Sequence, residues 1–210
     1  MMLTAEDALK RLQEGNKRFA ANASIAATFL DSARRAALLA GQAPFAIILG
    51  CSDSRVPAEL VFDQGLGDLF VIRVAGNIVA PSQVGSVEFA ASRFGTPLVV
   101  VLGHTQCGAI TATFEAVTGQ GQTASNNLRS IVERVRPAVE TVLAAGPHQS
   151  TEAIIHQAIR ANVRAAVDHL KHGSALLERL VQTAGLRIVG AEYSLETGIV
   201  EFFDDWNGDG

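Results

Sequence analysis

The sequence reads Phe45-Ala46-Ile47-Ile48-Leu49-Gly50 where an unbroken apolar run meets a glycine. A run of this kind is typical of a strand that is buried on both faces of a parallel sheet. Two later runs resemble it, Leu69 to Val74 and Leu98 to Leu102. Between these two, Gln83 to Phe94 carries apolar residues at helical spacing and predicts a crossover helix. The segments together predict a strand, helix, strand unit in a mostly parallel sheet.

Helical patterns stand on both sides of this unit. Thr4 to about Ala21 predicts an amphipathic helix with Thr4 as its N-cap, and Asp31 to Ala40 predicts a second helix that Gly41 ends with a left-handed cap. Three further helices are predicted over Ser125 to Ala145, Thr151 to His172 and Ser174 to Ala184. Strands that alternate with helices predict an α/β fold, a single domain over residues 1–210 with a central mostly parallel sheet flanked by helices.

The two ends of the chain differ from its middle. Residues 1–40 form a predicted N-terminal helical arm. Near the other end, Arg187 to Tyr193 and Ile199 to Phe203 are apolar or alternating segments on either side of a turn, and they predict a terminal β-hairpin. Residues 204–210 are expected to fray as a tail.

The composition excludes several classes of function. The 210 residues are 48% hydrophobic, which is enough to bury one substantial core. Acidic residues exceed basic ones by 21 to 17 without long runs of either sign, so nothing indicates a nucleic-acid partner. The apolar stretches are far shorter than the roughly 18 residues of a membrane span, and the N-terminus lacks the apolar core of a secretory signal. We therefore expect a cytoplasmic protein that binds small molecules and neither nucleic acid nor membrane.

Two cysteines and a histidine follow the predicted strands. Cys51 comes directly after the first strand, and His104 and Cys107 follow the third. Open α/β sheets bind ligands at the carboxyl ends of their strands, and two thiolates with one imidazole suit Zn²⁺. Three protein ligands leave one tetrahedral position free, which is the arrangement of catalytic rather than structural zinc sites. The sequence therefore predicts a catalytic zinc site.

Asp53 and Arg55 occupy alternate positions of the loop that follows Cys51. A guanidinium can orient a carboxylate through paired hydrogen bonds and keep it ionised. One carboxylate oxygen can then accept a hydrogen bond from zinc-bound water or hydroxide, and zinc lowers the pKa of its bound water to about 7. The pair indicates a metal that takes part in a reaction.

The chain resembles the β-class carbonic anhydrases in two motifs, Cys51-Ser52-Asp53-Ser54-Arg55 and His104-Thr105-Gln106-Cys107-Gly108. The resemblance spans roughly Met1 to Phe203 and also includes Gln42, Pro44, Val56-Pro57, Phe70 to Asn77, Gly85, Glu88 and Gly103. It implies reversible hydration of carbon dioxide to bicarbonate and a proton by zinc-bound hydroxide, with Zn²⁺ as the cofactor.

The resemblance also implies roles for individual residues. Asp53 would accept the hydrogen bond of the hydroxide, Arg55 would hold Asp53, and Gly108 would offer a backbone N–H nearby. The positions that bind or surround substrate in the family correspond to Gln42, Phe70, Ala75 and Phe89. Two of them depart from the family pattern, because Phe89 replaces the Tyr of plant relatives and Ala75 replaces a larger Val.

Family members form dimers whose active sites lie at the subunit interface, and the dimers often pair into tetramers. The resemblance therefore implies a homodimer or homotetramer whose N-terminal helices pack on a partner subunit. Some bacterial relatives have an allosteric bicarbonate site made of a Trp, an Arg and a Tyr. Here Arg73 and Tyr193 match that site, but Ile48 stands in place of the Trp.

In those regulated relatives the aspartate can leave its arginine and become a fourth zinc ligand in a closed, inactive site. Asp53 is the corresponding ligand here. Because the Trp is missing, we expect Asp53 to stay paired with Arg55 at neutral pH.

The motifs leave two other functions open. The same zinc site could hydrolyse CS₂ or COS, and measured turnover is needed to separate these substrates from carbon dioxide. A protein of a different class could use zinc only for stability and act as a non-catalytic partner. Asp53 and Arg55 argue against that class, because a structural metal requires a closed set of ligands and no aimed hydroxide.

Overall fold

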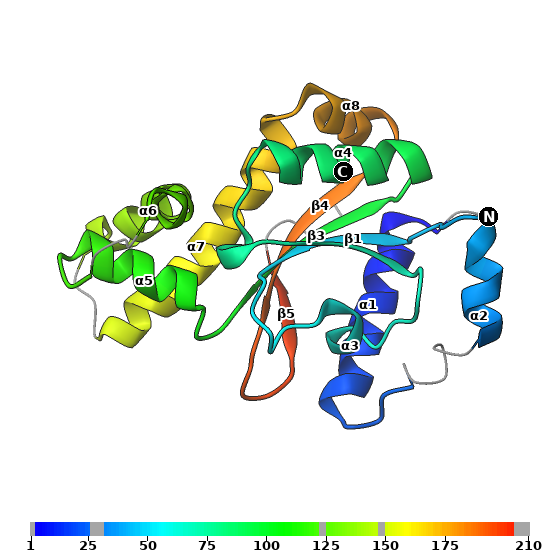
Figure 1. Cartoon of the computed structure of the whole chain (residues 1–210), viewed down its shortest axis with the longest axis horizontal. Helices are drawn as coiled ribbons and strands as arrows, with labels where there is room; N and C mark the ends of the chain where they lie inside the picture. The colour runs from blue at the N-terminus through cyan, green and yellow to red at the C-terminus, as the bar shows by residue number, and fades with distance from the viewer. Residues whose placement is uncertain (1–2, 26–31, 122–124, 147–149, 204–210) are drawn as a thin grey trace.

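The computed structural model describes residues 3–25, 32–121, 125–146 and 150–203. Its centre is a five-stranded sheet in the order β2-β1-β3-β4-β5 (Figure 1). The strands are β1 (Ala46–Gly50), β2 (Leu69–Arg73), β3 (Leu98–His104), β4 (Arg187–Tyr193) and β5 (Val200–Phe203). All neighbouring strands are parallel except β4 and β5, which pair as an antiparallel hairpin. The predicted sheet and its antiparallel terminal edge are both confirmed.

The burial of each strand follows its place in the sheet. Every residue of β1 and of β3 is buried, as their unbroken apolar runs predict. β2 is equally apolar in sequence, but it lies at the edge of the sheet and most of its residues are only partly buried. The apolar run therefore identifies the strand correctly but does not reveal that it is an edge strand.

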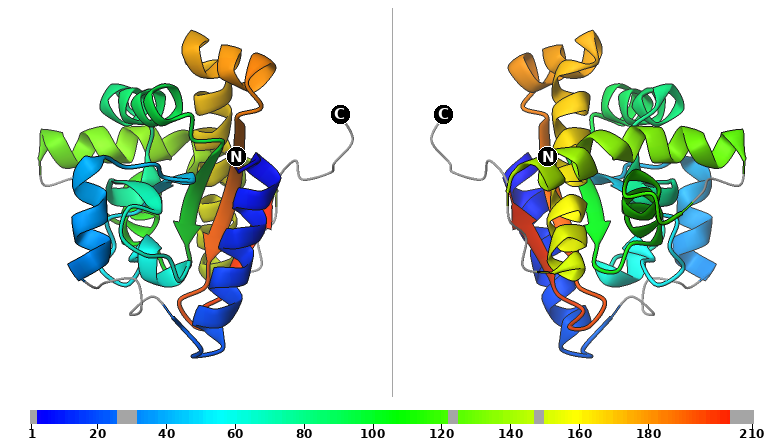
Figure 2. Two further views of the ribbon diagram at one scale, coloured as in Figure 1. Left: turned by 90° about the vertical axis from the view of Figure 1, so that its right-hand side faces the viewer. Right: turned by 90° about the vertical axis from the view of Figure 1, so that its left-hand side faces the viewer.

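Helices cover both faces of the sheet (Figure 2). On one face, Ile48 and Val100 pack with α1 (Ala5–Ala20) and α3 (Ala58–Val61). On the other face, their strand neighbours Ile47 and Val99 pack with α4 (Pro81–Phe94), α7 (Thr151–His172) and α8 (Ala175–Thr183). Successive side chains of a strand point to opposite faces, so the same two strands contribute to both cores.

A third apolar cluster lies beyond the carboxyl ends of the parallel strands. There α5 (Gly108–Val117) and α6 (Asn126–Ala144) pack against the first half of α7, and in Figure 1 they project to one side of the sheet. Cys51 and Cys107 are both part of this cluster. It closes the end of the sheet at which ligands bind in open α/β folds.

Most of the predicted helices are confirmed within a few residues. Thr4 caps α1 in a capping box with Asp7, and a serine side chain caps each of α6, α7 and α8. The second predicted helix divides into α2 (Ser32–Ala37) and the 3₁₀ turn η2 (Leu38–Ala40), and Asp31 lies outside the described residues. Gly41 has φ 146° and ψ −177°, so the expected left-handed helical cap is wrong. The backbone instead leaves η2 in an extended conformation that favours glycine.

The N-terminal arm belongs partly to the core of its own chain. The apolar face of α1, which includes Leu9 and Leu12, is buried against the sheet, whereas no residue of α2 is buried. The tail predicted at residues 204–210 lies outside the described residues. Among the helices described, none combines the length and the hydrophobicity that crossing a bilayer would require.

Candidate metal centre

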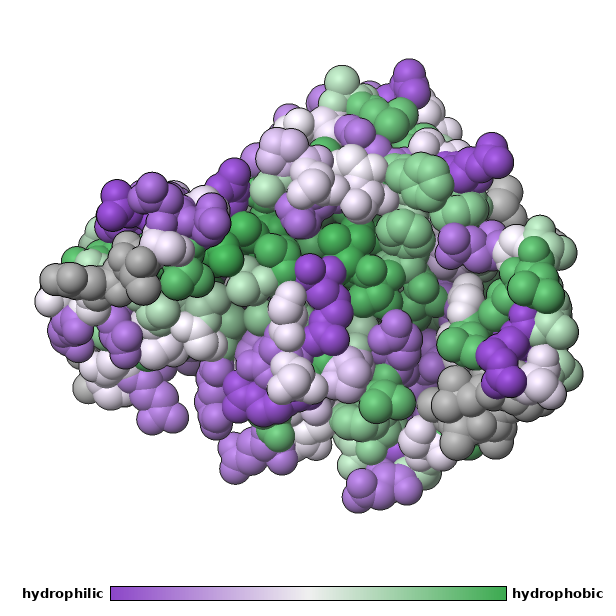
Figure 3. Space-filling model, viewed as in Figure 1, coloured by the Kyte–Doolittle hydropathy of each residue, from purple (hydrophilic) through white to green (hydrophobic). Residues whose placement is uncertain are grey.

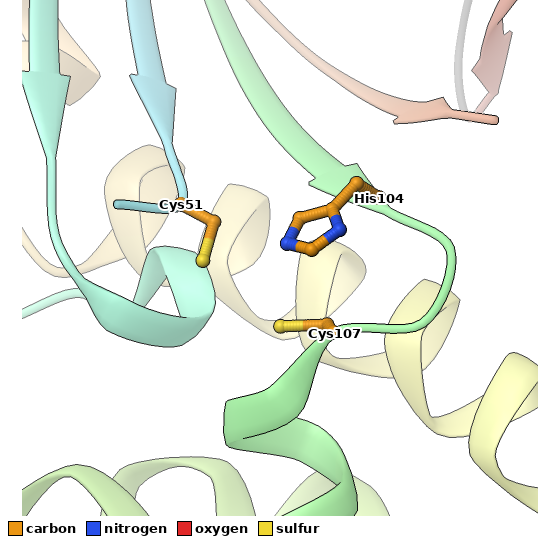
Figure 4. Close-up of side chains that lie close together, drawn as sticks. All are labelled: Cys51, His104 and Cys107. Atoms are coloured by element: carbon orange, nitrogen blue, oxygen red, sulfur yellow. The ribbon is translucent and has the colours of Figure 1, made fainter. Parts of the chain in front are cut away.

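Cys51, His104 and Cys107 converge at one point beyond the sheet (Figure 4). Cys51 directly follows β1, His104 is the last residue of β3, and Cys107 is the N-cap of α5. The chain passes from β1 to β2 on one side and then returns to β3 on the other side of β1. This is a topological switch point, where the loops diverge and leave a crevice for a ligand.

The geometry of the three side chains suits a metal ion. One donor atom from each side chain lies within 4.8 Å of the others, and all three side chains are buried. In a tetrahedral zinc site the donor atoms are about 3.5–3.8 Å apart, as follows from Zn–S and Zn–N bond lengths. The cluster would therefore need to contract by only about 1 Å to hold zinc.

His104 has one ring nitrogen without a partner. Its Nδ1 lies 2.8 Å from the carbonyl oxygen of Thr105, and because a carbonyl only accepts, Nδ1 carries the proton. Nε2 is then a free acceptor, and it is buried without a hydrogen bond among the residues described. An unsatisfied buried polar atom costs about 1–3 kcal/mol, and a metal ion would satisfy this one.

The two thiols of the cluster shift each other's pKa in opposite directions. The hydrogen bond from Cys107 lowers the pKa of Cys51 against the opposing effect of burial, and Gly76 N–H, 3.3 Å from Sγ, contributes in the same direction. The same hydrogen bond, together with burial, raises the pKa of Cys107. Burial is the largest influence on His104 and opposes a charged imidazole, but the nearby Cys51 thiolate, the Thr105 carbonyl and the Asp53 carboxylate together raise its pKa. The environment therefore favours a thiolate at Cys51, which is the form that binds a cation.

Asp53 and Arg55 form a fork-shaped ion pair beside the cluster. Arg55 Nε lies 2.9 Å from Asp53 Oδ1, and Arg55 Nη2 lies 2.7 Å from Asp53 Oδ2. These bonds hold the pKa of Asp53 well below its usual range. Oδ2 also lies 3.8 Å from Nε2 of His104, which places the carboxylate next to the donor atoms.

The loop that carries Cys51 and Asp53 is anchored by residues of other segments. Arg73, at the end of β2, donates to the backbone carbonyls of Cys51 and Asp53, at 3.0 and 2.5 Å. Arg55 reaches the carbonyl of Gln106 at 3.3 Å and so links the loop to the turn before Cys107. Sequence reasoning associated Arg73 only with an anion site and did not predict these anchors. The one sequence feature that could have indicated these hydrogen bonds is the position of Arg73 at the end of a strand.

Two of the expected substrate residues lie next to the cluster. Gly108 directly follows Cys107 and begins α5, and a Cβ placed on it would meet no atom within 4 Å. Its N–H lies in the first turn of the helix, at the positive end of the helix dipole. Ala75 begins the 3₁₀ turn η3 (Ala75–Asn77), whose Gly76 contacts Cys51 Sγ.

The other three expected substrate residues are not brought to the cluster of their own chain. Gln42 is exposed and precedes β1, so the five residues of that strand, at about 3.3 Å each, separate it from Cys51. Phe70 and Phe89 contact each other at 6.3 Å between ring centroids, and both also pack against Phe94. Phe89 is 52% exposed on α4. Within one chain, these side chains form a separate apolar surface.

A parallel sheet with a Cys-His-Cys cluster at its switch point defines an α/β protein with a candidate metal centre, and the carboxylate-arginine pair beside it is typical of an enzyme. The family model described as carbonic anhydrase matches residues 46–200. With this match and the relatives below, the chain belongs to the β-class carbonic anhydrase family.

Known relatives match over most of the chain. Carbonic anhydrase 2 of Mycobacterium tuberculosis is 39% identical over 192 residues, which are 91% of this chain and 89% of that protein. A carbonic anhydrase of Mycolicibacterium smegmatis is 39% identical over 194 residues, with 92% and 91% covered. The crystal structure of the β-carbonic anhydrase CafA of Aspergillus fumigatus superimposes with a TM-score of 0.75 at 26% identity, covering 94% of this chain and 91% of that one.

Proposed function

We propose that this chain binds Zn²⁺ through Cys51, His104 and Cys107 and catalyses the reversible hydration of carbon dioxide to bicarbonate and a proton. The observation that carries the proposal is the buried, unpartnered Nε2 of His104, which faces two thiols beside a carboxylate that an arginine holds. A bound zinc ion would lower the pKa of a water molecule to about 7 and so supply a nucleophile at neutral pH.

Asp53 would orient the attacking oxygen. Its depressed pKa keeps it ionised at neutral pH, so it accepts a hydrogen bond and does not supply a proton. Each oxygen receives a bond from the Arg55 guanidinium, and Oδ2 has lone-pair capacity left on the side of the cluster. Arg55 restricts the carboxylate to one orientation, which fixes the direction of the accepted hydrogen bond.

Gly108 and Ala75 would form the substrate side of the site. Carbon dioxide is small and uncharged, and its hydration places negative charge on oxygen. The Gly108 N–H at the start of α5 can donate to that oxygen, in the role of an oxyanion donor. The small side chain of Ala75 leaves more room than the Val of relatives.

Gln42, Phe70 and Phe89 would complete the site of a second copy of the chain. Their distance from their own cluster supports this arrangement, as does the exposure of Phe89. The face shown in Figure 3 presents a central area of hydrophobic side chains below α4. A cavity of about 780 Å³ also lies between α4, α6 and α7, and its lining includes Ile78, Pro81 and Val84. A homodimer is the smallest assembly that would cover this area, and a homotetramer would pair two such dimers.

The closed state, in which Asp53 would become a fourth zinc ligand, is disfavoured at neutral pH in this proposal. The fork-shaped pair with Arg55 opposes it. Arg73 is engaged by two backbone carbonyls, and Ile48 is fully buried where regulated relatives have a Trp. A zinc-loaded crystal at pH 7 with Asp53 Oδ at about 2.0 Å from the metal would overturn this part.

A reducing compartment such as the cytoplasm fits the cluster. Both cysteines are free thiols in the structure. Thiols persist in the cytosol, whereas oxidising compartments would favour their oxidation. Fractionation of cells that express the chain would test the location.

Metal analysis combined with stopped-flow carbon dioxide hydration tests the proposal directly. One zinc per chain and turnover well above the buffer background are expected. Chelation should abolish turnover, and added zinc should restore it. Fast hydrolysis of CS₂ or COS with background hydration of carbon dioxide would replace the proposed substrate. Zinc binding without turnover of any of the three would leave only a structural metal.

A further inference from the structure

Asn162 is a polar residue in an otherwise apolar stripe of α7. Ile159 and Ala166 are its neighbours at helical spacing and Val163 follows it, and all three are buried in the cores beneath the helix. Asn162 itself is only 5% exposed. Burying an amide is costly unless it is hydrogen-bonded, and an apolar side chain of similar size would pack there without that cost.

The amide of Asn162 is used to hold one backbone group. Its Nδ2 donates to the carbonyl oxygen of Gly76 at 2.9 Å, across 86 residues of sequence. Gly76 lies in η3 with φ 69° and ψ 19°, and Asn77 after it also has a positive φ of 42°. Glycine can leave this conformation at little cost, so the turn depends on hydrogen bonds that hold it, one of which joins Asn77 N–H to the Val74 carbonyl at 3.0 Å within the turn.

The opposite side of Gly76 contacts the metal cluster. Its N–H donates to Sγ of Cys51 at 3.3 Å. Two peptide planes meet at the Cα of Gly76. Asn162 holds the carbonyl of one plane, and Cys51 Sγ accepts from the N–H of the other. Fixing one plane therefore limits the rotation that would turn the N–H away from the thiolate.

We infer that Asn162 is a positioning residue of the metal centre, which acts through Gly76 on the Cys51 thiolate. This inference rests on the proposed zinc site. Residues outside the ligand set that orient ligands typically contribute 10- to 100-fold to metal affinity. Two hydrogen bonds through Gly76 connect Asn162 to Cys51 Sγ, so Asn162 would influence metal retention and ligand electronics without touching substrate.

The test compares zinc release from Asn162→Leu, wild type and a matched control, Asn16→Leu. Asn16 is 4% exposed on α1, and it bonds to the backbone of Val61, Gly198 and Val200, away from η3. Zinc transfer to a chromogenic chelator is followed at pH 7 on protein shown to be folded by circular dichroism. Asn162→Leu is expected to release zinc about 10- to 100-fold faster than wild type, and Asn16→Leu within about twofold of it. Asn162→Ala is the second variant, because its smaller side chain cannot clash in the same space.

A spectroscopic measurement separates positioning from general loss of stability. In the Co²⁺-substituted protein, an N–H···S bond stabilises the sulfur lone pair and raises the energy of the thiolate-to-cobalt absorption band. The band should move to longer wavelength in Asn162→Leu and should stay in place in Asn16→Leu. Unchanged release and an unchanged band in both Asn162 variants would overturn the inference, as would equal acceleration in Asn16→Leu. Failure of the wild-type chain to bind zinc would instead overturn the proposed function.

Discussion

Replacing Asp53 by Asn tests whether the carboxylate acts in the reaction or only in the fold. The side chain keeps its size but loses its charge and one of its two acceptor oxygens. In the structure Oδ1 accepts from the backbone N–H and Nε of Arg55, at 3.0 and 2.9 Å, and Oδ2 accepts from Arg55 Nη2 at 2.7 Å. An amide NH₂ in the position of Oδ2 would face a donor at that distance, so the amide must turn out of the fork.

The expected loss is in turnover, with little loss of metal. Losing one well-aimed polar group at a reacting atom costs about 10²- to 10³-fold in kcat, which corresponds to about 2.7–4 kcal/mol of activation free energy. Zinc should remain near one per chain, because the three ligands are intact. Stopped-flow hydration and metal analysis on the same preparation give both numbers.

A matched control is available on the surface of α6. Glu133 receives the same fork from Arg136, at 3.0 and 2.9 Å, within one helix turn. Glu133→Gln removes an equivalent ion pair and should leave kcat within about twofold of wild type, since exposed pairs contribute little. Turnover of Asp53→Asn within about threefold of wild type at full zinc content would refute the assigned role. Loss of zinc in Asp53→Asn would instead make Asp53 part of metal binding.

Three further outcomes are expected. Cys51→Ser should lower zinc affinity by at least about 100-fold in a chelator competition, because a hydroxyl is a poor zinc ligand; retention of one zinc per chain would contradict the ligand set. In metal-free protein, the stability that Asp53 contributes should be present above the unfolded Asp pKa of about 3.9 and be lost as pH falls through its lower folded pKa. The difference between wild type and Asp53→Asn in urea unfolding should therefore shrink from pH 6 to pH 3, and a widening difference would be inconsistent with the depressed pKa. Gly103→Ala should lower the free energy of unfolding by about 1–3 kcal/mol, since its Cβ would lie 2.6 Å from Val163 Cγ2. Gly50→Ala is the control and should be tolerated, because nothing lies nearer than 3.8 Å to its Cβ. Equal thermal unfolding midpoints for the two variants would show that α7 moves to accommodate the added methyl group.

The strands and the Cys-His-Cys cluster could be predicted because their signals are local. An apolar run such as Phe45 to Leu49 identifies a buried strand without knowledge of its neighbours, and parallel strands bring their carboxyl ends to one edge. The prediction of α1 depended on Thr4 and an apolar stripe within one segment. Each of these inferences required only residues close together in sequence.

Two helices next to the site were not predicted. α5 is rich in β-branched residues and apolar on most sides, so it has little helical periodicity, although Ile110, Phe114 and Val117 fall at helical spacing. α3 is four residues long, which is too short for any periodic signal. In both, tertiary packing rather than local pattern determines the helix.

The anchors of the metal loop could not be predicted because each joins distant segments. Arg73 reaches the loop from 20 and 22 residues away, and Asn162 reaches Gly76 across 86. The apolar residues at helical spacing around Asn162 place it near a buried stripe, but nothing in the sequence shows which group its amide bonds. Only the packing of α7 over β3 and β4 makes it buried and places its amide against η3.

The expected substrate residues could not be placed from one chain, because their position at a site depends on how two chains assemble. The resemblance groups Gln42, Phe70 and Phe89 with the site, yet in one chain they lie beyond or along the strands and not at the cluster. The resemblance and the single-chain placement agree if each chain contributes these residues to the site of its partner across an interface. Mixing an inactive Cys51→Ser chain with an inactive Phe89→Asp chain would then recover part of the activity, because a mixed dimer contains one intact site. No recovery in mixtures shown to form mixed dimers would mean that each chain completes its own site.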